Sequence, residues 1–202
     1  MVEGHTTHPA HAPAHLSGGY GMPARVRAWW VAAAVAGVTY GGMLTMVAVD
    51  VPPGTPLVGR IVAQPLWKML MALLLARAAS LHEIPRERRW LIGAMMFSAL
   101  GDLWLALPGL AFSFMAGLGC FLLAHLCYLR VLVGLRGVSS AIRMIGVGVM
   151  IGVAIGMLLW YWPGLGELKG PVIAYMVVLS AMVCAALLAR LPGPLTAWGA
   201  LA

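Results

Sequence analysis

Six long apolar segments, separated by short polar stretches, dominate the chain. They predict membrane-spanning helices at about 28–49, 58–79, 90–107, 110–133, 144–162 and 170–189. Each is close to the roughly 20 residues with which a helix crosses a hydrocarbon core of about 30 Å. A shorter apolar stretch at 195–202 predicts a partial seventh span. Transmembrane barrels consist instead of short segments of alternating polarity, so the pattern predicts an all-α, polytopic transmembrane helical bundle.

Composition and charge support a membrane protein. Apolar residues make up 62% of the chain and charged residues 9%, with a mean hydropathy of +0.93, whereas about a quarter of the residues of a soluble domain are charged. The net charge of +7 would suggest nucleic acid as the partner of a soluble protein, but here the basic residues lie between apolar runs. The tail and the second, fourth and sixth loops hold nearly all of them, which by the positive-inside rule predicts a cytoplasmic N-terminus and a multi-pass protein of the cell membrane.

The ends and the small residues of the chain add little chemistry. Residues 1–24, rich in His, Pro and Ala, predict a disordered tail, followed by one transmembrane domain over 25–202. Four histidines of the tail could bind a metal, but we expect no bound metal and no other cofactor. The Gly148-xxx-Gly152-xxx-Gly156 stripe predicts close helix packing. Three cysteines inside predicted spans argue against a disulfide framework.

Three ionisable side chains lie well inside the predicted spans, namely Lys68, Asp102 and His125. Such residues are costly in a bilayer and often mark functional sites. Counted from the turn at Pro108-Gly109, Asp102 lies about 9–10 Å deep and His125 about 24 Å deep, so straight antiparallel helices keep these two apart. Lys68 shares the depth of Asp102. It either pairs with the carboxylate, directly or through water, or extends along its stem toward the interface.

Other polar residues extend this layer into a predicted pocket. Gln64 opens the same helix as Lys68, and Ser98 precedes Asp102 by one turn, where it lines the pocket or bonds to its own backbone. Tyr175 enters the sixth span near the same depth. One face of the fourth span carries a stripe of four residues, Gly117, Phe121, His125 and Tyr128. That stripe is typical of core packing around a hydrogen-bonded histidine, and it would also suit a site.

These residues together resemble the YhhN-like family of multi-pass membrane proteins, which includes lysoplasmalogenases. The resemblance, over roughly residues 60–200, rests on motifs along the chain: Gln64-Pro65, Phe97-Ser98-x-x-Gly101-Asp102-x-x-Leu105, Gly117-x-x-x-Phe121-x-x-x-His125-x-x-Tyr128, Ala174-Tyr175, Ser180-Ala181-Met182 and Ala185-Ala186. The family usually has about eight helices and a second acidic motif near its C-terminus, which would fall just beyond Ala202. Many members also place a lysine where Gln64 stands, a charge that Lys68 could supply.

The resemblance implies hydrolysis of the vinyl ether bond of a lysoplasmalogen to a fatty aldehyde and a glycerophospho-headgroup. It implies Asp102 as the catalytic carboxyl group and Gln64, Lys68, Ser98, His125, Tyr128 and Tyr175 as residues that bind substrate or line the site. Protonated, Asp102 would act as an acid on the vinyl ether; ionised beside Lys68, it would stabilise the cation that forms. Without the second acidic motif we expect weak or no activity, unless association in a homo-oligomer completes the site.

The intramembrane charges leave other functions open. A small ion-coupled transporter or a lipid-handling protein without catalysis uses the same residue types, and so would a membrane scaffold that needs them only for folding. The partner that we expect is a membrane lipid of the lysophospholipid class, and no nucleic acid.

Overall fold

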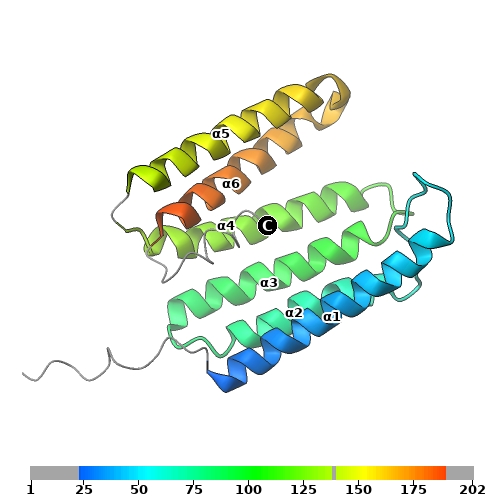
Figure 1. Ribbon diagram of the computed structural model, residues 1–202, viewed down its shortest axis with the longest axis horizontal. Coiled ribbons are helices and arrows are strands. Elements are labelled where there is room, and N and C mark those ends of the chain that lie inside the picture. Colours follow the sequence, from blue (N-terminus) through cyan, green and yellow to red (C-terminus); the bar gives the residue numbers. More distant parts are fainter. Residues whose placement is uncertain (1–22, 138–139, 190–202) are drawn as a thin grey trace, which may run out of the picture.

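The computed structural model describes residues 23–137 and 140–189, which form a helical bundle (Figure 1). Its α-helices are α1 (Ala24–Val49), α2 (Gln64–Ala79), α3 (Pro85–Leu105), α4 (Ser113–Gly134), α5 (Ala141–Tyr161) and α6 (Lys169–Leu188). Two short 3-10 turns, Trp162–Gly164 and Gly166–Leu168, join α5 to α6. The all-α prediction is confirmed for this part of the chain. The predicted tail lies almost entirely, and the partial seventh span wholly, outside the described residues.

The helices agree with the predicted spans except at the start of the second. Within the described residues, four segments are long and apolar enough to cross a membrane: Ala24–Val49, Ser113–Gly134, Ala141–Gly164 and Gly166–Leu188. The prediction of helix from residue 58 is wrong, because α2 begins only at Gln64. Gly59 has a positive φ of 82°, which belongs to a turn, and Pro65 in the first turn suits a helix start. With 16 residues, α2 is only about 24 Å long, so six full spans remain a prediction.

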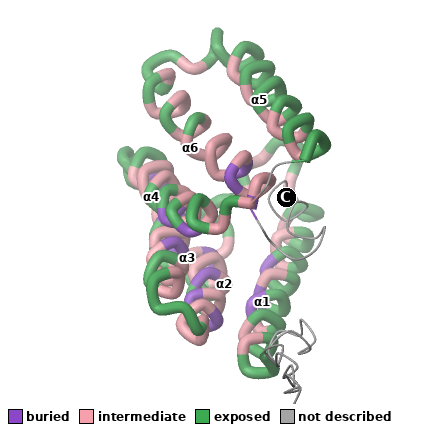
Figure 2. Tube along the Cα trace, turned by 90° about the vertical axis from the view of Figure 1, so that its left-hand side faces the viewer, coloured by how far each residue is buried: buried purple, intermediate pink, exposed green. Residues whose placement is uncertain are grey.

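Each helix packs mainly on its spatial neighbours, in the order α1, α2, α3, α4, α6, α5. In Figure 1, α1 to α4 run alongside one another, and the α5–α6 hairpin joins them where α6 meets α4. Buried residues gather in α1 to α4 and near the end of α6, while most of α5 is exposed (Figure 2). This order puts α3 between α2 and α4, so residues on different faces of α3 meet different helices.

The outer surface of the bundle is apolar. Large side chains such as Val38, Ile142 and Trp160 are 77%, 80% and 81% exposed, which would be unfavourable in water and suits contact with lipid. On α5, an added Cβ at Gly148, Gly152 or Gly156 would meet no described atom within 4 Å. The sequence-based expectation that this glycine stripe packs closely against another helix is therefore wrong within the described residues.

Polar contacts join the segments at the two ends of the bundle. At one end, the Gln64 side chain accepts a hydrogen bond from the Gly59 N–H (2.7 Å) and donates one to the Tyr40 hydroxyl (2.9 Å). A Cβ on Gly59 would lie 3.3 Å from Pro108, so this loop rests on the α3–α4 turn. At the other end, His82 pairs with Glu87 at 2.8 Å. These contacts link α1 to the start of α2 near one end of the bundle, and the α2–α3 loop to the start of α3 at the other.

Candidate active site

The closest helix packing in the bundle surrounds the glycines of α3 and α4. A Cβ added to Gly101 would lie 2.7 Å from the Phe121 ring, and one added to Gly117 would lie 2.8 Å from Leu105 and 3.3 Å from the Gly101 carbonyl oxygen. Backbones approach this closely only where side chains are absent. Gly101, Gly117 and Phe121 of the sequence motifs are therefore packing residues, and the contact they make sets the position of the neighbouring Asp102.

Asp102 lies near the C-terminal end of α3 and is half-buried. Lys68 of α2, also half-buried, is near enough to act electrostatically on its carboxyl group. Across the described residues, however, no ion pair with an N–O distance of 4.0 Å or less involves Asp102. The structure thus puts Lys68 and Asp102 on facing sides of α2 and α3, as their equal depth suggested, but without a direct salt bridge.

Gln64 lies one turn before Lys68 and is only 1% exposed. Its amide oxygen and nitrogen are both engaged, with Gly59 and Tyr40. A buried amide that is paired at both ends is typical of a structural anchor. Its partner Tyr40, 8% exposed, was missed by the sequence reasoning. The available signal was a hydroxyl inside an apolar span, which usually finds a hydrogen-bond partner when buried.

His125 and Tyr175 meet between α4 and α6. Their rings are 5.3 Å apart at 79°, an edge-on contact. The Nδ1 atom of His125 is hydrogen-bonded to the Phe121 carbonyl oxygen. Because a carbonyl only accepts hydrogen bonds, Nδ1 is the donor, and in the neutral ring Nε2 keeps its lone pair. Tyr175 thus contacts the histidine, a contact that residue counting did not predict.

Ser98 and Tyr128 lie where α3 packs on α4. The Tyr128 hydroxyl donates to the sulfur of Met95 at 3.5 Å and lies beside the Ser98 hydroxyl. Met95 and Ser98 share with Asp102 one face of α3, since residues at i, i+3 and i+7 coincide on a helix. Among the described residues no hydrogen bond or ion pair joins Asp102 to His125, which agrees with their predicted difference in depth.

The chemical repertoire of the described residues is narrow. No group of three or more His, Cys, Asp or Glu side chains could hold a metal ion there, and the histidines of the tail lie outside the described residues. Cys120, Cys127 and Cys184 are free thiols. Asp102 lies in the last turn of α3, and among the described carboxylates it is the half-buried one that forms no ion pair, so it is the group best placed to act on a substrate within the bilayer.

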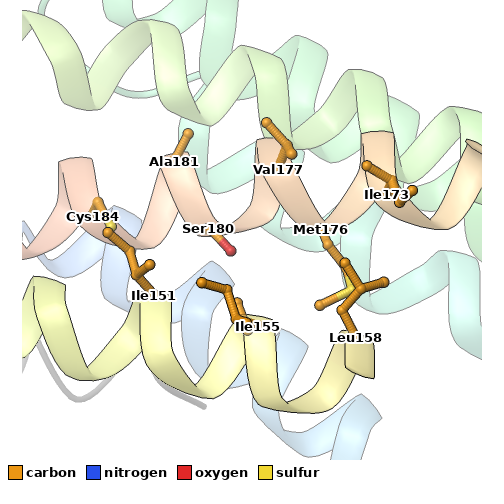
Figure 3. Close-up of a pocket in the computed structure, with 10 residues that line it drawn as sticks. Ile151, Ile155, Leu158, Ile173, Met176, Val177, Ser180, Ala181 and Cys184 are labelled. Atoms are coloured by element: carbon orange, nitrogen blue, oxygen red, sulfur yellow. The ribbon is translucent and has the colours of Figure 1, made fainter. Parts of the chain in front are cut away.

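Apolar space for a lipid chain lies between α5 and α6. A cavity of about 340 Å³ is bounded by Ile151 and Ile155 on one side and by Met176, Ser180 and Cys184 on the other (Figure 3). Ser180 contributes the hydroxyl group visible in this view. Such a lining suits an alkyl chain, although Asp102 does not border this cavity.

Comparison with known proteins gives a consistent result. Residues 63–202 match the YhhN family. Two proteins named lysoplasmalogenase, from Mycobacterium bovis and Mycobacterium tuberculosis, are each 47% identical over 194 residues, which covers 94% of this chain and 70% of each relative. No solved structure matches the chain.

Proposed function

Because this chain belongs to the YhhN family, we propose that it is a membrane hydrolase that cleaves the vinyl ether bond of lysoplasmalogens. Its 47% identity to two lysoplasmalogenases supports the substrate class, and its apolar helices suit an enzyme whose substrate resides in a bilayer. The observation that carries the mechanism is the half-buried carboxyl group of Asp102, inside α3 and near Lys68.

The reaction needs one proton donor and one water molecule. Transfer of a proton to the β-carbon of the vinyl ether converts the C=C–O unit into an oxocarbenium ion. Water adds to the cationic carbon and loses a proton, which gives a hemiacetal. The hemiacetal collapses with cleavage of its C–O bond to the glycerol oxygen, releasing a fatty aldehyde and the glycerophospho-headgroup. The net change is the addition of one water molecule.

Asp102 suits this chemistry as the carboxyl group that faces the reacting carbon. A positioned acid or base commonly contributes a factor of about 10²–10⁴ in rate, and a carboxylate near an oxocarbenium ion also stabilises its charge, as in glycoside hydrolysis. Lys68, close to Asp102 but not bonded to it, is placed to attract the phosphate of the headgroup. Ser98 adds a hydroxyl group one turn before Asp102 on the same face of α3. The Tyr128 hydroxyl of α4 bonds to Met95, two turns before Asp102 on that face.

Aldehyde release from a lysoplasmalogen by membranes that contain the full chain tests this proposal. Asp102→Asn removes the acid while keeping the shape of the side chain, and we expect at least about a 10²-fold lower rate. Glu167→Gln, the same change at an exposed residue of a 3-10 turn, is the matched control and should retain the rate. Equal rates for wild type and Asp102→Asn would remove Asp102 from the mechanism. Uptake of the lipid by vesicles without release of aldehyde would indicate a carrier.

The same proposal includes a membrane arrangement. We propose six spans in the cell membrane with the N-terminus in the cytoplasm, because basic residues are concentrated in alternate loops of the sequence. Arg86, Arg88 and Arg89 at the start of α3 would then lie at the cytoplasmic interface. Labelling of single cysteines introduced at Thr55 and at Glu83 from either side of the membrane tests this orientation, since the two loops should react from opposite sides.

A further inference from the structure

A second cavity lies on the face of α3 that points away from Asp102. It measures about 390 Å³ and is lined by Arg86, Arg89, Trp90, Gly93 and Phe97 of α3 and by Cys127 of α4. At 100° per residue, the five α3 residues fall within a stripe about 100° wide, and Asp102 lies about 160° from Arg86. We refer to these six residues as the α3–α4 groove. It is separate from the candidate active site.

The charge at one end of the groove is uniformly positive. Arg86 and Arg89 are exposed, and neither forms an ion pair with any described carboxylate. The nearby Glu87 forms no ion pair with either arginine, and its carboxylate contacts His82 at 2.8 Å instead. Arg130 follows Cys127 by three residues on α4 and is exposed as well, so a third guanidinium stands at the same end. This end therefore carries the positive charge that attracts a phosphate group.

The rest of the groove is apolar and shaped by a glycine. A Cβ on Gly93 would come no closer than 3.6 Å to any atom, its nearest neighbour being the Cys127 sulfur, so the missing side chain leaves room above Cys127. From Arg86 to Phe97 the α3 helix rises about 16 Å. This equals about half of the roughly 30 Å hydrocarbon core, the depth of one leaflet. Trp90, 41% exposed, stands between the arginines and the apolar part, where interfacial tryptophans are common.

We propose that the α3–α4 groove binds an anionic phospholipid of the bilayer, with its phosphate at Arg86 and Arg89 and one acyl chain along Trp90, Gly93 and Phe97. A free phosphate or a soluble headgroup would account for the arginines at one end of the groove, but not for the apolar residues along the rest of it. A zwitterionic lipid lacks the net negative charge that an unpaired cluster of guanidinium groups selects. The proposal does not depend on the hydrolase activity, because the groove and Asp102 occupy opposite faces of α3.

Native mass spectrometry of the purified full chain, titrated with phosphatidylglycerol or phosphatidylcholine, tests this site. We expect wild type to retain phosphatidylglycerol preferentially. The Arg86→Gln/Arg89→Gln variant should bind it about 30-fold more weakly, which corresponds to about 2 kcal/mol at tenfold per 1.4 kcal/mol. The Arg25→Gln/Arg27→Gln variant removes the same charge from exposed positions of α1 and should bind like wild type.

A second variant separates the groove from simple surface charge. Gly93→Leu keeps both arginines but fills the apolar part of the groove, so this variant should also bind phosphatidylglycerol more weakly. In wild type, glycerol phosphate should fail to displace phosphatidylglycerol. Equal losses of phosphatidylglycerol affinity in the Arg25/Arg27 and Arg86/Arg89 variants would show that binding depends only on overall positive charge, and would overturn the proposal. Unchanged binding in Gly93→Leu, or competition by glycerol phosphate, would also overturn it. Circular dichroism of every variant confirms that the helices remain intact.

Discussion

Gly101→Ala is the sharpest test of the helix contact that positions Asp102. The new methyl carbon would lie 2.7, 2.8 and 3.1 Å from three atoms of the Phe121 ring, all closer than ordinary van der Waals contact. Either the ring must rotate or α3 and α4 must separate. Added atoms in a packed interface typically cost about 1–3 kcal/mol.

Gly93→Ala is the matched control on the same helix. Its methyl carbon would meet the Cys127 sulfur at 3.6 Å, an ordinary contact. Any gain from replacing glycine by alanine in a helix, about 0.5–1 kcal/mol, applies to both variants and cancels in their comparison. We therefore expect Gly101→Ala to be less stable than Gly93→Ala by about 2 kcal/mol, or roughly 4–8 °C in Tm for a chain of this size.

Thermal unfolding of the purified chain in detergent, followed by tryptophan fluorescence, measures this difference. Phe121→Leu removes the ring atoms in contact, so it should partly rescue Gly101→Ala, with a coupling energy above about 0.5 kcal/mol in a double-mutant cycle. If the two alanine variants unfold at the same temperature, or if Phe121→Leu gives no rescue, the close contact of α3 with α4 is not a determinant of stability and the reasoning fails.

Two further predictions concern polar contacts at the ends of the bundle. Gln64→Leu should lower stability by about 1–3 kcal/mol in the same unfolding assay, because it leaves the Tyr40 hydroxyl and the Gly59 N–H without their partner. Tyr40→Phe removes only one of these two hydrogen bonds and should lower stability by less. A Gln64→Leu variant as stable as wild type would refute the anchor role. Glu87→Gln should cost less than about 1 kcal/mol, because the His82–Glu87 pair is partly exposed (37% and 22%) and screened by solvent. A larger loss would mean that Glu87 holds the α2–α3 loop by contacts other than this pair.

Much of the candidate site could be foreseen from positions along the helices. Counting residues from the α3–α4 turn put Lys68 and Asp102 at one depth and His125 at another, and the structure has Lys68 acting on Asp102 with no bond from Asp102 to His125. This reasoning works because helical rise is constant, so depth follows from residue number. It says nothing about which helices become neighbours, and the ring contact of Tyr175 with His125 across α4 and α6 was not foreseen.

The role of each polar group depended on its partners. Gln64 was expected to line the site, but a hydroxyl 24 residues earlier in the chain and a loop N–H engage its amide. The glycines of α5 and those of α3 and α4 look equally suited to close packing in the sequence. An added Cβ at Gly101 or Gly117 would lie within 3.0 Å of a side chain of the facing helix, while one on the α5 stripe would meet no described atom within 4 Å. Small residues allow close approach without determining which helix approaches.

Local sequence was sufficient to determine the all-helical architecture of the described residues and most of their helix boundaries. Within a bilayer every backbone polar group must be satisfied inside its own segment, so an apolar run of sufficient length has to form a helix regardless of its neighbours. The tertiary structure alone decided the neighbour order α1, α2, α3, α4, α6, α5 and the hydrogen bond between Gln64 and Tyr40. It also decided that Asp102 and the α3–α4 groove lie on opposite faces of α3. Helix association in lipid lacks a strong hydrophobic driving force and depends on shape and hydrogen bonds between distant residues, which a linear pattern does not encode.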